Sequence, residues 1–122
     1  MKIQELRIGN YINHSELSGI TEVIAIGKDY IHILFNNETL YESIKWFTPI
    51  PLTEEWLLKF DFTLKSDIDG EYYEKNGVKV LILRSETIHF FFGNPYTKEK
   101  YVHELQNYFH INTGEELTLH IS

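Results

Sequence analysis

The chain of 122 residues contains no cysteine, which excludes disulfide bonds, thiolate catalysis and cysteine-based zinc or iron–sulfur sites. No segment is apolar over the length needed to cross a membrane, and residues 1–7 lack the apolar core of a signal peptide. From these features we expect a cytoplasmic protein that does not associate with a membrane.

Basic residues are also scarce. Eleven Lys and Arg stand against eighteen Asp and Glu, giving a formal net charge of −7. A protein that binds the nucleic-acid backbone needs clustered Lys and Arg. Nucleic acid is therefore a disfavoured partner.

Of only three prolines, two lie in the segment that divides the chain. Pro49 and Pro51 fix φ and disfavour helix in the residues before them, so β structure upstream must end here. Thr53 can then cap a helix whose first turn is acidic, where carboxylates meet the positive end of the helix dipole. The sequence predicts a short helix over residues 54–60.

Upstream of the prolines the pattern is typical of short strands. Residues 6–12 alternate like a strand, although Gly9-Asn10 could instead turn the chain. Two β-branched runs, 20–26 and 30–35, flank Gly27-Lys28-Asp29 and predict a hairpin, and residues 39–47 can add a fourth strand. So many short strands in about fifty residues predict a small SH3-like antiparallel barrel over residues 1–52.

In residues 53–122 the sequence predicts the short helix, then an antiparallel meander of strands, then a longer helix. Strands are expected near 62–64, 71–74, 78–83 and 87–92, with turns at 67–70 and Asn76-Gly77. After a break at 93–95, Thr97 can cap a helix over 98–111 that ends at Gly114, and residues 117–121 alternate like an edge strand. The fold class is α+β, in a single compact domain of residues 1–122.

The longer predicted helix has one broad apolar face. Tyr101, Val102, Leu105 and Phe109 recur at helical spacing and predict core positions. On the opposite side, His103, Gln106 and Asn107 are predicted as surface positions and candidate contacts.

Two patterns could bind metal ions, and both have a simpler explanation. Glu99, His103 and His110 could share one helix face, but a solvated helix face explains them better. Residues 67–71 begin like a calcium loop, yet Gly70 stands at position four and strands are expected on both sides, so a polar hairpin turn is favoured. We expect neither a metal site nor a cofactor.

No set of residues suggests catalysis. Glu54-Glu55 complements a helix start and Glu115-Glu116 follows a helix end, while no serine lies in a nucleophile elbow and no glycine-rich phosphate loop exists. We therefore expect no catalytic residues and no enzyme.

Aromatic residues make up 15% of the chain, which indicates either a ring-rich core or a ring-lined surface. Small SH3-like barrels commonly bind ligands along ring-lined faces, so Tyr11, Tyr30 and Tyr41 are the candidate binding residues there. For Trp46, core packing is the favoured interpretation. Residues 89–92 form a strand that is either buried on both sides or displays a ring to a partner.

Three blocks of this chain are similar to those of a known family: residues 5–10 (ELRIGN), 49–62 (PIPLTEEWLLKFDF) and 101–117 (YVHELQNYF followed by TGEEL). In these blocks the chain resembles a family of small uncharacterised proteins of Bacteroides-type bacteria, their phages and mobile elements. The family often has Gly where Asp61 stands here, and a Leu-Tyr-Phe-Ala-Leu text where this chain has residues 108–111. The resemblance implies a phage or mobile-element setting and supplies no catalytic residues.

The leading hypothesis is a non-enzymatic intracellular accessory module that binds a host or phage protein. The alternative is a nucleic-acid or nucleotide-binding accessory protein that uses the aromatic face of the barrel. The alternative predicts that Lys2, Arg7, Lys28 and Lys45 lie near exposed rings and that this face is not acidic. The two hypotheses therefore differ in the charge expected around the rings.

Overall fold

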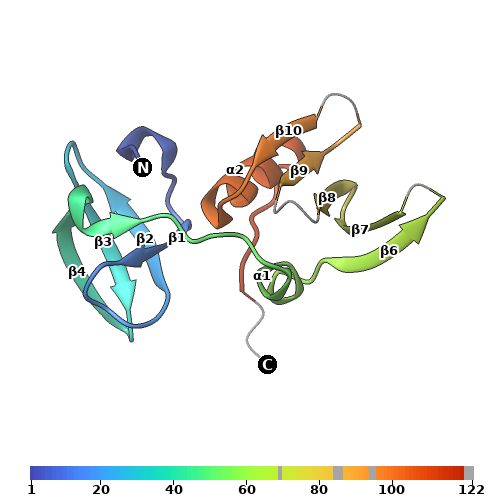
Figure 1. Cartoon of the computed structure of the whole chain (residues 1–122). Helices are drawn as coiled ribbons and strands as arrows, with labels where there is room; N and C mark the ends of the chain where they lie inside the picture. Colours follow the sequence, from blue (N-terminus) through green and yellow to red (C-terminus); the bar gives the residue numbers. More distant parts are fainter. Residues whose placement is uncertain (69, 84–86, 94–95, 120–122) are drawn as a thin grey trace. The chain divides into compact units, whose positions relative to one another are not determined.

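The computed structural model describes residues 1–68, 70–83, 87–93 and 96–119, without the side chains of 96–99. The predicted α+β class is confirmed, since the chain forms two antiparallel five-stranded sheets and two α-helices (Figure 1). The chain divides into two compact units, Met1–Pro51 with Tyr101–His103 and Leu52–Lys100 with Glu104–Ser122. That the whole chain is one domain stays a prediction.

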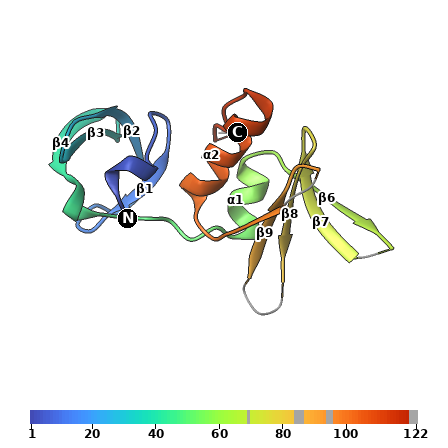
Figure 2. The same ribbon diagram turned by 90° about the horizontal axis from the view of Figure 1, so that it is seen from above.

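The N-terminal unit is a curled half-barrel with the strand order β4-β3-β2-β1-β5 (Figure 2). Its elements are the 3₁₀ turn η1 (Ile3–Glu5), β1 (Tyr11–His14), β2 (Thr21–Ile26), β3 (Tyr30–Phe35), β4 (Glu38–Ser43), the 3₁₀ turn η2 (Ile44–Trp46) and β5 (Phe47–Thr48). The predicted hairpin is therefore confirmed as β2–β3. The core that the curled sheet encloses consists of Leu6, Ile12, Val23, Ile31, Ile33 and Phe47.

The first strand begins later than predicted. Gly9 has a φ of +98°, in the left-handed region, and the Arg7 N–H donates to the side-chain oxygen of Asn10 at 2.7 Å. This turn occupies the first half of the predicted strand, so the prediction of a strand over residues 6–12 is wrong there. The alternative, a turn at Gly9-Asn10, is confirmed, and β1 starts at Tyr11.

Helix α1 (Glu54–Lys59) begins where the sequence predicts it. The Trp56 N–H donates to the Thr53 hydroxyl oxygen at 3.4 Å, so Thr53 is the N-cap, and two glutamates occupy the first turn. Trp56 and Leu57 are buried along one side of this short helix. The helix is stable because that side is packed, since six residues alone would not remain helical.

We expect the substitution Thr53→Ala to lower the free energy of unfolding by about 1 kcal/mol, because it removes the side-chain acceptor at the helix start. Chemical denaturation measures the change. Ser18→Ala, at an exposed position in a loop, is the matched control and should change stability by less than about 0.5 kcal/mol. Equal effects of the two substitutions would show that the cap contributes nothing.

The second unit contains a meander with the strand order β10-β9-β8-β7-β6. Its further elements are β6 (Thr63–Asp67), β7 (Gly70–Lys75), β8 (Val78–Ile82), β9 (Ile88–Phe91), β10 (Tyr96–Glu99) and α2 (Val102–Thr113). Asn76 and Gly77 both have positive φ, at +49° and +88°, which is the backbone of the tight β7–β8 turn that the sequence predicts.

Two predictions at the C-terminal end are wrong. The segment predicted to begin the long helix at Thr97 forms strand β10 instead, paired with β9, and α2 begins at Val102. The described residues 115–119 form no strand, and Ile121 lies outside the described residues. Gly114 does end the helix as predicted, with a φ of +76° and its N–H donating to the His110 carbonyl at 2.8 Å.

Helices α1 and α2 contribute to the core of the second unit together with one face of its sheet. Its fully buried apolar side chains include Leu57, Phe60, Val78, Val80, Phe90, Leu105 and Phe109. Val102, in the N-terminal unit, is buried as predicted, whereas Tyr101 is only half-buried. Tyr101 precedes the helix, which explains why helical spacing misplaced it.

The stability of the second unit depends on pH through one buried phenol, that of Tyr73. Burial raises the pKa of Tyr73 above 10.0, and the Glu54 carboxylate, which also hydrogen-bonds the phenol, raises it further. The unfolded chain releases this proton near pH 10 while the folded chain retains it, so we expect stability to fall as pH rises above about 10. Urea unfolding measures the free energy of unfolding at pH 8 and at pH 11. The decrease between the two pH values should be smaller for Tyr73→Phe than for the wild type. An equal decrease in the two proteins would show that the Tyr73 phenol is not the source of the pH dependence.

Candidate functional site

The most prominent exposed cluster in the N-terminal unit is formed by Tyr30, His32 and Tyr41, which we term the ring patch. Ile31 and Ile33 of β3 are fully buried, and side chains alternate along a strand, so Tyr30 and His32 point away from the core. The β3–β4 register places His32 opposite Tyr41. One hairpin therefore gathers the three rings on its outer face.

The rings are in direct contact and remain exposed. The Tyr30 and Tyr41 rings are stacked with centroids 5.0 Å apart and planes 19° apart, and the His32 ring meets Tyr41 edge-on at 4.4 Å. Tyr30 is 45% exposed and Tyr41 is 60% exposed. Ordered rings at this level of exposure are the kind of surface that a partner buries.

A shallow hollow lies beside the ring patch. The register places Ser43 opposite Tyr30, and a hollow of about 170 Å³ lies beside His32 and Tyr41. The carboxylate-bearing residues of β4, Glu38 and Glu42, alternate onto the other face of the strand. Strand β4 is also an outermost strand of the sheet, so the patch lies at a sheet edge.

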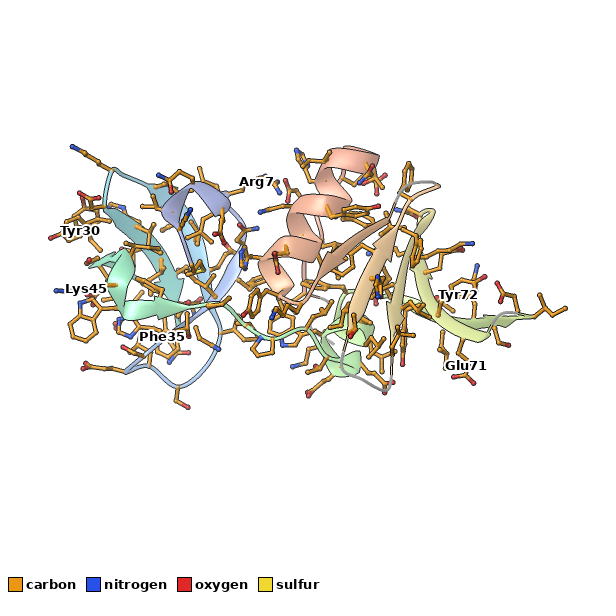
Figure 3. The ribbon with its side chains drawn as sticks, turned by 45° about the horizontal axis from the view of Figure 1, so that its top comes forward. Arg7, Tyr30, Phe35, Lys45, Glu71 and Tyr72 are labelled. Atoms are coloured by element: carbon orange, nitrogen blue, oxygen red, sulfur yellow. The ribbon has the colours of Figure 1, made fainter. Side chains whose placement is uncertain are left out.

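A second exposed ring lies just after β4. Trp46 is 38% exposed, so the prediction that it belongs to the core is wrong. The Lys45 ammonium lies 5.8 Å from the centre of the Trp46 ring, and the His14 ring stacks with it at 6.3 Å. Trp46 leaves the core because it ends a 3₁₀ turn, where β alternation no longer holds. Figure 3 labels Tyr30 and Lys45 in this unit.

Of the binding residues predicted from the sequence, the structure brings Tyr30 and Tyr41 together. Tyr11 is only 6% exposed and lies in the strand next to the barrel core, so it is not part of the patch. His32 was not predicted as a binding residue. The available signal was its i+2 spacing from Tyr30 in a predicted strand, which places both on one face.

The prediction that three polar residues of the long helix lie on the surface is largely wrong. His103 and Gln106 are buried, and Asn107 is half-buried. Gln106 donates to the Leu117 carbonyl at 3.4 Å, so the chain after the helix covers this side. The spacing of residues within a helix could not predict that the following segment folds back against it.

Each histidine of α2 has a carboxylate neighbour. His103 Nε2 lies 3.5 Å from a carboxylate oxygen of Glu5, and His110 Nδ1 lies 3.1 Å from one of Glu116. The side chain of Glu99 lies outside the described part of the structure. Within that part, no group of three His, Asp or Glu side chains could hold a metal ion.

Among the described helices, none has the length and apolar character to span a membrane. Comparison with protein-family models, with curated proteins and with solved structures gives no match. The ring patch is therefore assigned from its own geometry.

Proposed function

We propose that the chain is a cytoplasmic, non-enzymatic accessory module of the phage or mobile-element type, which binds a host or phage protein through the ring patch. The observation that carries the proposal is the exposed stack of Tyr30 on Tyr41 at the edge of a sheet. The sequence resemblance described above supports the phage or mobile-element setting.

Tyrosine is among the residues that dominate protein interfaces, because a rigid ring gives a large contact area and its hydroxyl retains a hydrogen bond. Here two tyrosines and a histidine are already ordered against one another, so little side-chain entropy is lost when a partner covers them. The adjacent edge strand β4 can also pair with an extended segment of the partner.

Photo-crosslinking tests the proposal. A photoreactive phenylalanine analogue at position 41 should yield one discrete protein adduct in host cells. The same analogue at position 58 is the matched control, since Leu58 is 58% exposed on α1 and Tyr41 is 60% exposed on β4. Adducts of equal yield and composition at both positions would contradict binding through the ring patch.

The second candidate function is nucleic-acid or nucleotide binding. It is favoured by the Lys45 ammonium over the exposed Trp46 ring, because single-stranded bases stack on rings beside cations. If this candidate is right, oligothymidylate should quench the wild-type fluorescence more than that of Trp46→Phe, which retains Trp56. Equal fractional quenching of the two proteins, or none, would exclude it.

A further inference from the structure

Strand β6 forms an open edge of the second sheet. It is an outermost strand, and among the described residues it pairs with β7 alone. All five of its residues are exposed. The β6–β7 hairpin extends away from the rest of the second unit in two views (Figure 1, Figure 2), so no described element of that unit covers the edge. An uncovered edge is a template for one further strand.

The open edge presents the backbone of Leu64 and Ser66. Asp67 and Gly70 flank a two-residue loop, so they form a hydrogen-bonded pair of the hairpin. Hydrogen-bonded and non-hydrogen-bonded pairs alternate along an antiparallel ladder. The N–H and C=O groups of Lys65 therefore point toward β7, whereas those of Leu64 and Ser66 point outward. An incoming strand would form its main-chain hydrogen bonds with these two residues.

The side chains of β6 differ between the two faces of the sheet. Lys65 and Asp67 lie on one face, whereas Leu64 lies on the other face with the buried Tyr73. Leu64 is half-exposed, and Ile68 is wholly exposed at the tip of the hairpin. The edge therefore offers a cation, an anion and two apolar side chains within five consecutive positions.

This pattern matches a second copy of the same strand. In an antiparallel two-fold pairing centred on Ser66, Lys65 of each copy stands opposite Asp67 of the other, and Leu64 stands opposite Ile68. Opposite charges and apolar side chains at facing positions both stabilise a strand pair. Ser66 faces Ser66 of the second copy across the axis, where the two residues can exchange main-chain hydrogen bonds because their backbone groups point outward.

Charge disfavours the neighbouring registers. Pairing centred on Lys65 would bring two ammonium groups face to face, and pairing centred on Asp67 would bring two carboxylates face to face. Pairing centred on Leu64 would place Lys65 opposite Thr63, so no ion pair would form there. Charge complementarity therefore selects the pairing centred on Ser66.

Lys65 can join this contact without losing its own ion pair. Its ammonium lies 2.7 Å from a carboxylate oxygen of Glu74 on the same hairpin. An ammonium group has three donors, so it can hold the Glu74 carboxylate and the Asp67 carboxylate of a second copy together. The ion pair within the hairpin also holds the Lys65 side chain on the face where Asp67 of the second copy would arrive.

We propose that β6 pairs with β6 of a second copy of this chain, antiparallel and centred on Ser66, so that two five-stranded sheets join into one. A contact along five residues is only about 17 Å long and buries less than the about 1,200 Å² of a standard interface. The dimer is therefore weak and forms at high protein concentration. This edge is separate from the ring patch, and the inference does not depend on the proposed function.

The test uses the full chain labelled with ¹⁵N at concentrations from about 0.05 to 1 mM, the range of a weak contact. The amide signals of residues 64–68 should move with concentration, and sedimentation velocity should show the mean mass rising toward that of a dimer. Signals and mass that do not change with concentration would overturn the proposal. Movement confined to residues 38–43 would place the contact at β4 and would also overturn it.

Matched proline variants show which edge is used. Ser66→Pro removes an outward N–H of β6 and leaves the hydrogen bonds to β7 in place, so it should weaken self-association at least about tenfold. Thr39→Pro is the control on the edge strand β4, where Thr39 stands next to the Phe35–Glu38 pair that flanks the loop and so also has an outward N–H. It should leave self-association unchanged. Wild-type self-association of a Ser66→Pro chain with unaltered β8 and β9 signals would contradict the proposal.

Charge-reversal variants test the register. Lys65→Glu leaves two acidic residues at these positions, and Asp67→Lys leaves two basic ones, so neither variant should self-associate. An equimolar mixture should associate at least about tenfold more tightly than either variant alone, because only the mixed pair places opposite charges at both positions. Unaltered β7 signals show that each hairpin is intact. Equal association of the mixture and of the separate variants would contradict pairing centred on Ser66.

Discussion

Replacement of Phe109 by alanine is expected to lower the free energy of unfolding by about 3–5 kcal/mol. Phe109 is fully buried in α2, where its ring lies 6.1 Å from that of Phe62 and the Lys75 ammonium lies 5.9 Å from its centre. Removing the ring leaves a cavity between the helix and the segment that follows α1. Urea denaturation followed by circular dichroism measures the change.

The control for this prediction lies two residues along the same helix. Ile111 is 78% exposed, so Ile111→Ala should change stability by less than about 0.5 kcal/mol. If the Phe109→Ala chain fails to fold, Phe109→Leu keeps most of the apolar volume and should still be measurably less stable than Ile111→Ala. A Phe109 variant as stable as the Ile111 variant would contradict the assigned core.

The double substitution Tyr30→Ala with Tyr41→Ala is expected to weaken binding of the proposed partner by at least about a hundredfold. Interface tyrosines at hot spots contribute about 2 kcal/mol or more each on truncation, and about 2.7 kcal/mol is already a hundredfold. Both rings are exposed in the free protein, so the variant should retain its fold. Calorimetry with the protein identified by crosslinking at position 41 measures the affinity.

Leu58→Ala is the control for the double variant, because it removes an exposed apolar side chain of α1. It should bind as the wild type does. A folded double variant with wild-type affinity would show that the ring patch is not the contact surface.

The sequence predicted the fold well wherever local chemistry decides the backbone. The β2–β3 hairpin, the Thr53 cap and the Asn76-Gly77 turn each depend on residues that act within a few positions of one another. Prediction was wrong for β10, because its pairing with β9 outweighs the helical pattern that begins in the same segment.

The candidate site was only partly predictable. Tyr30 and Tyr41 could be nominated as aromatic residues of a small barrel, but their contact depends on the β3–β4 register and on which face Ile31 buries. His103 and Gln106 illustrate the opposite error, because segments distant in sequence cover polar residues that an isolated helix would expose. The opening between β7 and β8 was not predicted, since it depends on where the pairing of these two strands stops.

The most direct test of the proposed function is an amide chemical-shift map of the ¹⁵N-labelled chain, titrated with the protein captured by crosslinking at position 41. We expect the largest shifts on Tyr30, His32, Tyr41 and their neighbours in β3 and β4. Shifts confined to the second unit, with β3 and β4 unaffected, would contradict it.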